Sequence, residues 1–114
     1  MSECIFCAIV AGEVPADVVA RTSRTVAFRD LDPQAPTHVL VVPTDHVASA
    51  AEVGPEHAEV LAELLSTARS VAEAEGILGP GYRLVLNVGD DAGNTVAHLH
   101  LHLLGGRRMA WPPG

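Results

Sequence analysis

The chain has 114 residues, of which 48% are hydrophobic, and it carries a formal net charge of −7 without a single lysine. This length and composition fit one domain spanning residues 1–114, and no apolar stretch is long enough to span a membrane. The acidic balance argues against general nucleic-acid binding, and a chain without lysine cannot form a Walker A phosphate loop. The first four residues lack the basic and apolar regions of a signal peptide, so we expect a cytoplasmic protein.

The first half of the chain predicts one short helix followed by three strands. An apolar run at residues 4–11 ends at Gly12, a residue type that commonly stops helices. Two short strand-like runs separated by residues 22–24 predict a hairpin, and two prolines within residues 32–36 predict a turn. The predicted strands cover residues 18–21, 25–29 and 38–42.

The second half predicts one long helix and two further strands. Residues 55–75 have helical periodicity, with Pro55 suited to the first position and Gly76 to the stop. Strands are predicted at residues 82–88 and 98–104, with a flexible loop at 89–93 between them. Together these elements predict an α+β domain with a mostly antiparallel sheet. The predicted apolar face of the helix comprises Leu61, Leu64, Leu65, Ala68, Val71 and Ala72.

Three histidines alternate with leucines at residues 98–102. Side chains alternate between the two faces of a strand, so His98, His100 and His102 share one face while the leucines pack on the other. A purely structural role does not explain three imidazoles on one face. A metal site is the main alternative, since histidine is a common metal ligand. However, the outer rings would stand about 13 Å apart along the strand, too far for one ion with bonds of about 2 Å.

This motif and its surroundings resemble the histidine triad (HIT) family, and most of all its Hint branch of nucleoside phosphoramidases. The resemblance covers nearly the whole chain and depends on the order and spacing of several segments together. It implies a HIT-like fold: a mostly antiparallel five-stranded sheet with one major and one short helix, extended across a homodimer. The segments that carry it are residues 5–6, 12–16, 27–30, 33–38 and 93–114.

The resemblance implies roles for the triad and its neighbours. His100 would be the nucleophile, forming a covalent nucleotidyl-histidine at the α-phosphate, because imidazole is both nucleophile and leaving group near neutral pH. His102 would stabilise charge on the phosphate oxygens, and His38 would orient His100 and fix its tautomer. Thr95 would hand a proton to the leaving group. The other catalytic and phosphate-side positions are His98, Asn87, Gly93 and Asn94.

The resemblance also assigns residues of this chain to the ribose and the base of a nucleotide. Asp30 would accept hydrogen bonds from both ribose hydroxyls, although without the surrounding match it would be taken for a solvated charge. Asn94 stands where glutamine is usual and Ala110 where close relatives can have histidine, which leaves the leaving-group preference open. The apolar slot for the base would comprise Phe6, Ile9, Val14, Phe28, Leu31 and Leu40.

Cys4 and Cys7 have the spacing of a metal-ligand pair. Inert thiols and a redox pair are the alternatives, although the βαβ context of a thioredoxin-like motif is missing. Some prokaryotic HIT proteins hold structural zinc with such a pair and two histidines, which the resemblance places at His46 and His98. The sequence thus offers a structural Zn²⁺ site, with no cofactor required for the chemistry. His57 is expected to be merely solvated on the polar side of the long helix.

These inferences favour a hydrolase that cleaves phosphoramidate or acyl-phosphate bonds at the α-phosphate of a purine nucleotide such as AMP or GMP. The first alternative is a dinucleoside polyphosphate hydrolase with the same nucleophile, and the second is a regulatory nucleotide-binding protein with incidental catalysis. The expected homodimer would be joined along the helix at 55–75 and the strand at 82–88. Trp111 in the tail would reach the partner's active site.

Overall fold

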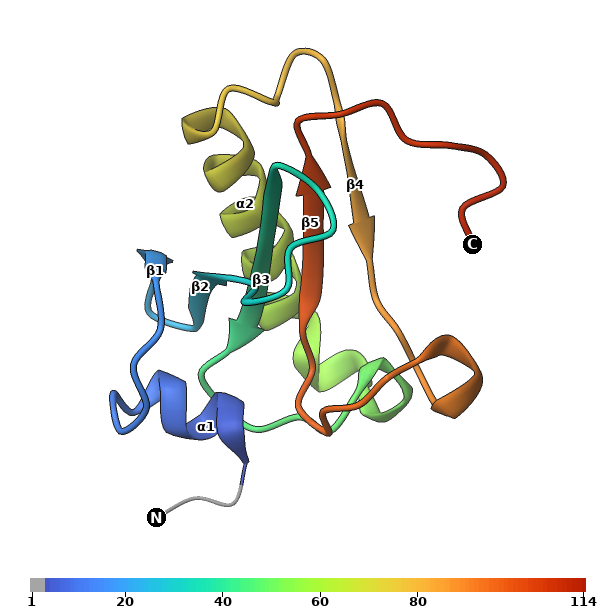
Figure 1. The fold of residues 1–114 in the computed structure, drawn as a ribbon. Helices are drawn as coiled ribbons and strands as arrows, with labels where there is room; N and C mark the ends of the chain where they lie inside the picture. The colour runs from blue at the N-terminus through green and yellow to red at the C-terminus, as the bar shows by residue number, and fades with distance from the viewer. Residues whose placement is uncertain (1–3) are drawn as a thin grey trace.

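A five-stranded antiparallel sheet forms the centre of the molecule (Figure 1). The computed structural model describes residues 4–114, and within them the strands follow the order β1-β2-β3-β5-β4. Every neighbouring pair is antiparallel, which confirms the predicted fold class. The strands are β1 (Val18–Arg21), β2 (Thr25–Arg29), β3 (Thr37–Pro43), β4 (Tyr82–Val85) and β5 (Leu101–Gly105).

The central strand β3 is buried along its whole length. A strand that is covered on both faces needs apolar side chains at consecutive positions, and residues 39–42 supply them. Leu40 pairs with Phe28 on β2 and with His102 on β5. Directly opposed residues point to the same face of a sheet, so these three side chains form one row across it.

The two α-helices pack against opposite faces of the sheet. Helix α1 (Ile5–Val10) packs against Val26, Phe28, Leu40 and Val42, whereas α2 (Ala58–Ala74) packs against the alternate residues of the same strands. The hydrophobic core therefore has two parts, one under each helix. None of the helices in residues 4–114 has both the length and the apolar character needed to cross a membrane.

Both helices end at the predicted glycines. Gly12 follows α1 with φ of +78° and Gly76 follows α2 with φ of +75°, a left-handed conformation that glycine adopts without steric cost. The start of the long helix differs from the prediction, because residues Pro55–His57 form a separate 3-10 turn. His57 Nδ1 accepts a hydrogen bond from the Gly54 amide at 2.9 Å, so this ring closes the turn and is not merely solvated.

Leu65 does not belong to the buried face of α2. Its side chain is 54% exposed, whereas Leu64, Ala68, Val71 and Ala72 are buried. Leu65 follows the buried Leu64 by one position, and one step along a helix turns its side chain away from the face that meets the sheet. A second 3-10 turn, Ala50–Glu52, lies in the connection between β3 and α2.

The last two strands are shorter at the triad end than predicted. β4 stops at Val85 and β5 begins at Leu101, so His98 and His100 precede the paired strand. The alternation nevertheless holds, because the intervening leucines 99, 101 and 103 are all buried in the core under α2. The loop at 89–93, which was predicted to be flexible, contains a 3-10 turn, Asp90–Ala92.

Candidate active site and metal cluster

A cavity of about 280 Å³ lies beside α1, β2 and β3, at the side of the sheet that carries His100 and His102. Ten residues predicted for the nucleotide line it: Phe6, Ile9, Val14, Phe28, Asp30, Leu31, Leu40, Thr95, His100 and His102. The prediction missed Ile5, Pro15, Ala16, Arg29 and Val96, which also line the cavity. Four of them directly neighbour a predicted residue in the chain, and Ala16 lies two positions after Val14, so sequence proximity was the signal that could have found them.

The apolar part of this cavity is built from α1 and the row across the sheet. The rings of Phe6 and Phe28 meet edge to face with centroids 5.4 Å apart, and Phe6 lies 5.1 Å from the ring of His100. Leu31 is almost fully exposed, at 99%, and forms part of the rim. This slot, apolar inside and open at one side, is suited to a flat aromatic base.

The backbone sets the tautomer of the neutral His100 ring. Its Nδ1 lies 2.7 Å from the carbonyl oxygen of His98. A carbonyl only accepts hydrogen bonds, so Nδ1 of the neutral ring carries the proton and Nε2 keeps its lone pair. His100 therefore presents the unprotonated nitrogen that a nucleophile needs.

His38 contacts His102 and not His100, contrary to the prediction. The amide of Gln34 donates to His38 Nδ1 at 3.0 Å, so the ring proton of His38 is on Nε2. That Nε2 lies 2.9 Å from His102 Nδ1 and donates to it. The prediction was wrong because β3 and β5 place His38 opposite Leu104, on the far side of His102 from His100.

The contact with His38 determines which nitrogen of His102 carries the proton. Since its Nδ1 accepts from His38, its proton is on Nε2, a buried atom without a hydrogen-bond partner among residues 4–114. Burial lowers the pKa of His102 to about 4, and the neighbouring rings of His100 and His38 contribute to the decrease. At neutral pH this ring is an uncharged donor in the wall of the cavity, which fits an oxyanion as its missing partner.

The ring of His98 does not take part in this cavity. It is fully buried, its Nε2 donates to the carbonyl of Pro43 at 3.0 Å, and its Nδ1 faces the sulfur atoms of Cys4 and Cys7. The side chain of His98 thus lies outside the cavity lining, and its catalytic role stays a prediction. Its backbone carbonyl, which holds His100, is the part that acts on the cavity.

Asp30 lies at the polar edge of the cavity. One carboxylate oxygen, Oδ1, accepts from the amide of Asp32 at 2.8 Å, and Oδ2 lies 3.5 Å from His38 Nε2. The side chain is 21% exposed, so lone pairs of the carboxylate remain accessible to a ligand. This placement beside the apolar slot is compatible with the predicted contact to a ribose.

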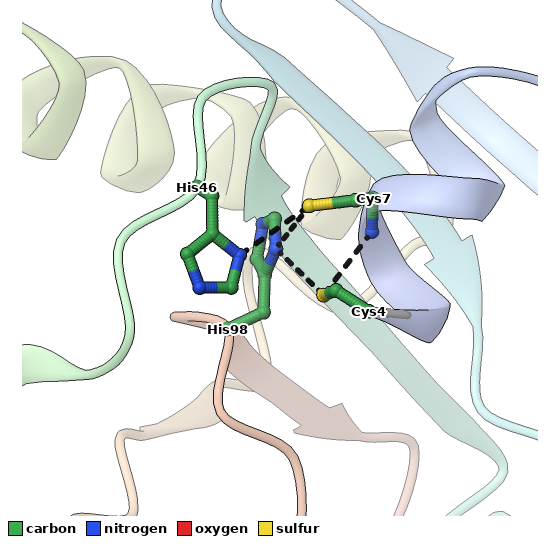
Figure 2. A group of neighbouring side chains, drawn as sticks. All are labelled: Cys4, Cys7, His46 and His98. Atoms are coloured by element: carbon green, nitrogen blue, oxygen red, sulfur yellow. Dashed lines mark hydrogen bonds between the residues drawn. The ribbon is translucent and has the colours of Figure 1, made fainter. Parts of the chain in front are cut away.

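Cys4, Cys7, His46 and His98 converge on one point (Figure 2). Their donor atoms all lie within 4.8 Å of one another, and the S–N distances are 3.3 Å for Cys4–His98, 3.3 Å for Cys7–His46 and 3.4 Å for Cys7–His98. Ligand atoms around a tetrahedral zinc ion are separated by about 3.6 Å. The tautomer also fits, because the Pro43 carbonyl keeps the proton of His98 on Nε2 and leaves Nδ1 as the ligand.

A second group, Asp30, His38 and His102, is as closely spaced but does not fit a metal. The Gln34 amide requires the lone pair of His38 Nδ1, so Nε2, the atom that faces the group, keeps its proton. A protonated imidazole nitrogen cannot coordinate an ion. Of the two groups, only the one with the thiols offers an imidazole nitrogen, His98 Nδ1, that is unprotonated and not engaged by another histidine.

A family model of the HIT domain matches residues 11–109. The chain belongs to the HIT domain family. A HIT family hydrolase from Legionella pneumophila, solved as a crystal structure, is 51% identical, with a TM-score of 0.96 over 98% of this chain and 100% of the other. A 14 kDa zinc-binding protein of Zea mays is 46% identical over 99% of this chain and 89% of its own length. The purine nucleoside phosphoramidase of Escherichia coli K12 is 43% identical over 94% of this chain and 90% of its own.

Three positions carried over from the HIT resemblance lie outside the cavity wall. Asn87, Gly93 and Asn94 do not line it. The amides of Gly93 and Asn94 are used within their own loop, donating to Asp90 and Gly89. Asn94 Oδ1 is buried without a partner in the described part of the chain, as is His102 Nε2.

Proposed function

We propose that this HIT hydrolase cleaves phosphoramidate or acyl-phosphate bonds at the α-phosphate of purine nucleoside monophosphates. The observation that carries the proposal is the pair of rings in the cavity wall. His100 has a lone pair on Nε2, and His102 has a proton on Nε2 with no partner in residues 4–114. A nucleophile beside a neutral hydrogen-bond donor is the arrangement required for attack on a phosphate.

The proposed reaction has two steps. His100 Nε2 attacks the α-phosphorus, and the bond to the leaving group breaks with its electron pair, while Thr95 passes a proton to a departing amine. Water then attacks the phosphorus of the nucleotidyl-histidine, and the electron pair of the P–N bond returns to Nε2. The proton of that water goes to Thr95 when an amine has left, and to solvent when a carboxylate has left. His102 stabilises the phosphate oxygens in both steps and remains neutral. The products are the nucleoside monophosphate and the free amine or acid.

The nucleotide would lie with its base between the apolar side chains of α1, β2 and β3. Asp30 would accept from the ribose hydroxyls, because a carboxylate can take two such hydrogen bonds. The name of the Escherichia coli relative, a purine nucleoside phosphoramidase, supports this choice of substrate.

Zinc is proposed at the group of Cys4, Cys7, His46 and His98, in a structural role. The donor spacing and the tautomer of His98 support it, as does the name of the zinc-binding relative from Zea mays. When bound, the ion would supply a tetrahedral link between α1, the loop after β3 and the segment before β5. The reaction above requires no cofactor.

A homodimer is the proposed assembly. Apolar side chains are exposed along the outer strand β4 and beyond it, with Leu84 at 37%, Leu86 at 42% and Val88 at 43%. Trp111 in the tail is 82% exposed and does not fold back on its own subunit. A second copy of the chain would cover this edge. Light scattering at micromolar concentration checks the mass, and a monomer would exclude the dimer.

The proposed function is tested by steady-state hydrolysis of adenosine and guanosine phosphoramidates beside a diadenosine polyphosphate. We expect the phosphoramidates to have the higher kcat/KM and a nucleotidyl adduct on His100 to be trapped by acid quench and mass spectrometry. A preference for the polyphosphate would support the alternative hydrolase. Tight nucleotide binding without turnover of either class would instead support a regulatory binding protein.

A further inference from the structure

The chain turns sharply where it leaves β5, against the loop that precedes β3. Gly106 makes this turn with φ of +88°, and a Cβ atom at this position would lie 2.9 Å from Cβ of Pro36. Only glycine allows both the left-handed conformation and this close approach. The residue that follows, Arg107, is thereby placed over residues 32–36.

The guanidinium of Arg107 holds a single carbonyl of that loop. Its Nε and one terminal nitrogen donate to the backbone oxygen of Gln34 at 3.2 and 3.0 Å, and its other terminal nitrogen donates to the carbonyl of Arg108 at 3.2 Å. A planar group with several fixed N–H directions restrains an acceptor better than a single ammonium does.

Gln34 is also the residue whose amide sets the tautomer of His38. Its N–H donates to His38 Nδ1, and this contact keeps the ring proton of His38 on Nε2, directed at His102. If the amide moved away, His38 could carry its proton on Nδ1, and His102 would then have to donate through its own Nδ1. The proton on His102 Nε2, at the cavity wall, would be lost from a neutral ring.

We propose that Arg107 is a positioning residue for the His38–His102 pair, acting from the tail through the backbone of Gln34. A series of three hydrogen bonds thus runs from the guanidinium to the Gln34 carbonyl, from the Gln34 amide to His38, and from His38 to His102, which lines the cavity. The expected effect of Arg107 on kcat rests on the proposed function. The expected effect on the tautomers of His38 and His102 does not depend on it.

Arg107→Ala and Arg107→Lys test this inference, with Arg108→Ala as the matched control. Arg108 is the adjacent arginine, and its side chain has no hydrogen bond or ion pair within residues 4–114. The main measurement is the ¹⁵N spectrum of the imidazole nitrogens in histidine-labelled protein near neutral pH, because protonated and unprotonated ring nitrogens have well-separated shifts. The second is steady-state kinetics with an adenosine phosphoramidate.

In Arg107→Ala we expect the Nδ1 signals of His38 and His102 to move from the unprotonated toward the protonated position. We also expect kcat to fall about three- to tenfold, the scale of one charge-assisted hydrogen bond, with KM within about twofold. Arg107→Lys should recover part of both effects, and Arg108→Ala should match the wild type.

Imidazole signals of both Arg107 variants that coincide with those of Arg108→Ala would overturn the inference, whatever the activity. If the wild type hydrolyses no phosphoramidate, the proposed function fails, but the ¹⁵N comparison still decides the role of Arg107. Melting curves confirm that each variant is folded, and the exposed position of Arg107 favours this.

Discussion

Two groups of histidines lie close together around the triad, and backbone groups of opposite kind determine what each can do. His98 faces Cys4, Cys7 and His46, and a carbonyl, that of Pro43, accepts the proton of its Nε2. His38 faces His102, and an amide, that of Gln34, donates to its Nδ1. The first group therefore directs an unprotonated nitrogen, His98 Nδ1, at the cysteines, and the second directs a protonated nitrogen, His38 Nε2, at His102.

This difference shows that histidine spacing alone does not distinguish a metal site from a proton-donor site. Both groups place three or more potential ligand atoms within 4.8 Å of one another. A carbonyl on the outer nitrogen produces a ligand, and an amide on the outer nitrogen produces a donor. His100 joins the two groups, since its Nδ1 is held by the backbone of His98 and its ring lies 5.0 Å from that of His102.

The largest expected effect comes from removing the residue between the two groups. His100→Ala should reduce kcat by about 10³-fold or more, because no other side chain supplies the attacking lone pair. AMP should still bind, because Asp30 and the apolar slot are intact. Single-turnover kinetics and calorimetric titration measure the two quantities. Turnover within about tenfold of wild type would rule out His100 as the nucleophile.

Metal content provides a direct test of the difference between the two groups. Protein purified without chelators should contain about one zinc ion per chain. Cys7→Ser should lose most of it and unfold with a free energy lower by about 3 kcal/mol, measured by elemental analysis and denaturant titration. His102→Ala is the control from the other group and should keep its zinc. Equal metal loss in both variants, or a metal-free wild type, would contradict the assignment.

The protonation of His102 predicts how stability depends on pH. Its pKa falls from 6.5 to about 4 on folding, mainly because of burial, so the unfolded state binds more protons between these values. The contribution of His102 to the free energy of unfolding is therefore fully present above pH 6.5. It is lost as the pH falls toward 4 and amounts to at most about 3 kcal/mol.

His102→Asn removes this titrating group, and its free energy of unfolding should decline less steeply below pH 6.5. Urea titrations across the acid range measure both slopes. Parallel curves for the variant and the wild type would show that His102 is not buried in its neutral form. His38, whose pKa is also lowered by burial, still titrates in both proteins.

The smallest effect is expected for Asp30, which belongs to the group of His38 and His102, and it concerns nucleotide affinity. Asp30→Ala should weaken AMP binding by about 1–3 kcal/mol, the range for hydrogen bonds to a charged acceptor. With a 2′,3′-dideoxy nucleotide the wild type and the variant should bind alike, because the hydroxyl partners are missing. Calorimetry with both ligands measures the difference. An equal loss for the dideoxy nucleotide would place Asp30 in another role.

The strands and the residues around the cavity could be predicted from the sequence, because they depend on local patterns. The bounds of β1 and β2 agree with the prediction, and the alternation at residues 98–103 separates leucines from histidines even where the strand is unpaired. Residues 86–88 were predicted as strand from the same pattern. They have no partner strand within residues 4–114, so alternation alone did not define the end of β4.

The partners of the histidines could not be predicted in the same way. The carbonyl that accepts from His98 is 55 positions away at Pro43, and His38 meets His102 across 64 positions. These contacts depend on the register between β3 and β5, which the composition of either strand does not reveal. The prediction that His38 orients His100 was wrong for this reason. No pattern in the sequence indicated that Arg107 would bind the backbone of Gln34.

Helix α1 has only six residues, and a helix of this length is not stable in water by itself. It nevertheless supplies Phe6 and Ile9 to the cavity and carries Cys7 of the metal cluster, with Cys4 as its N-cap residue. A nucleotide and a metal ion would therefore each order the same short segment. Thermodynamic linkage then makes this effect reciprocal. The factor by which bound metal raises the affinity for the nucleotide equals the factor by which bound nucleotide raises the affinity for the metal.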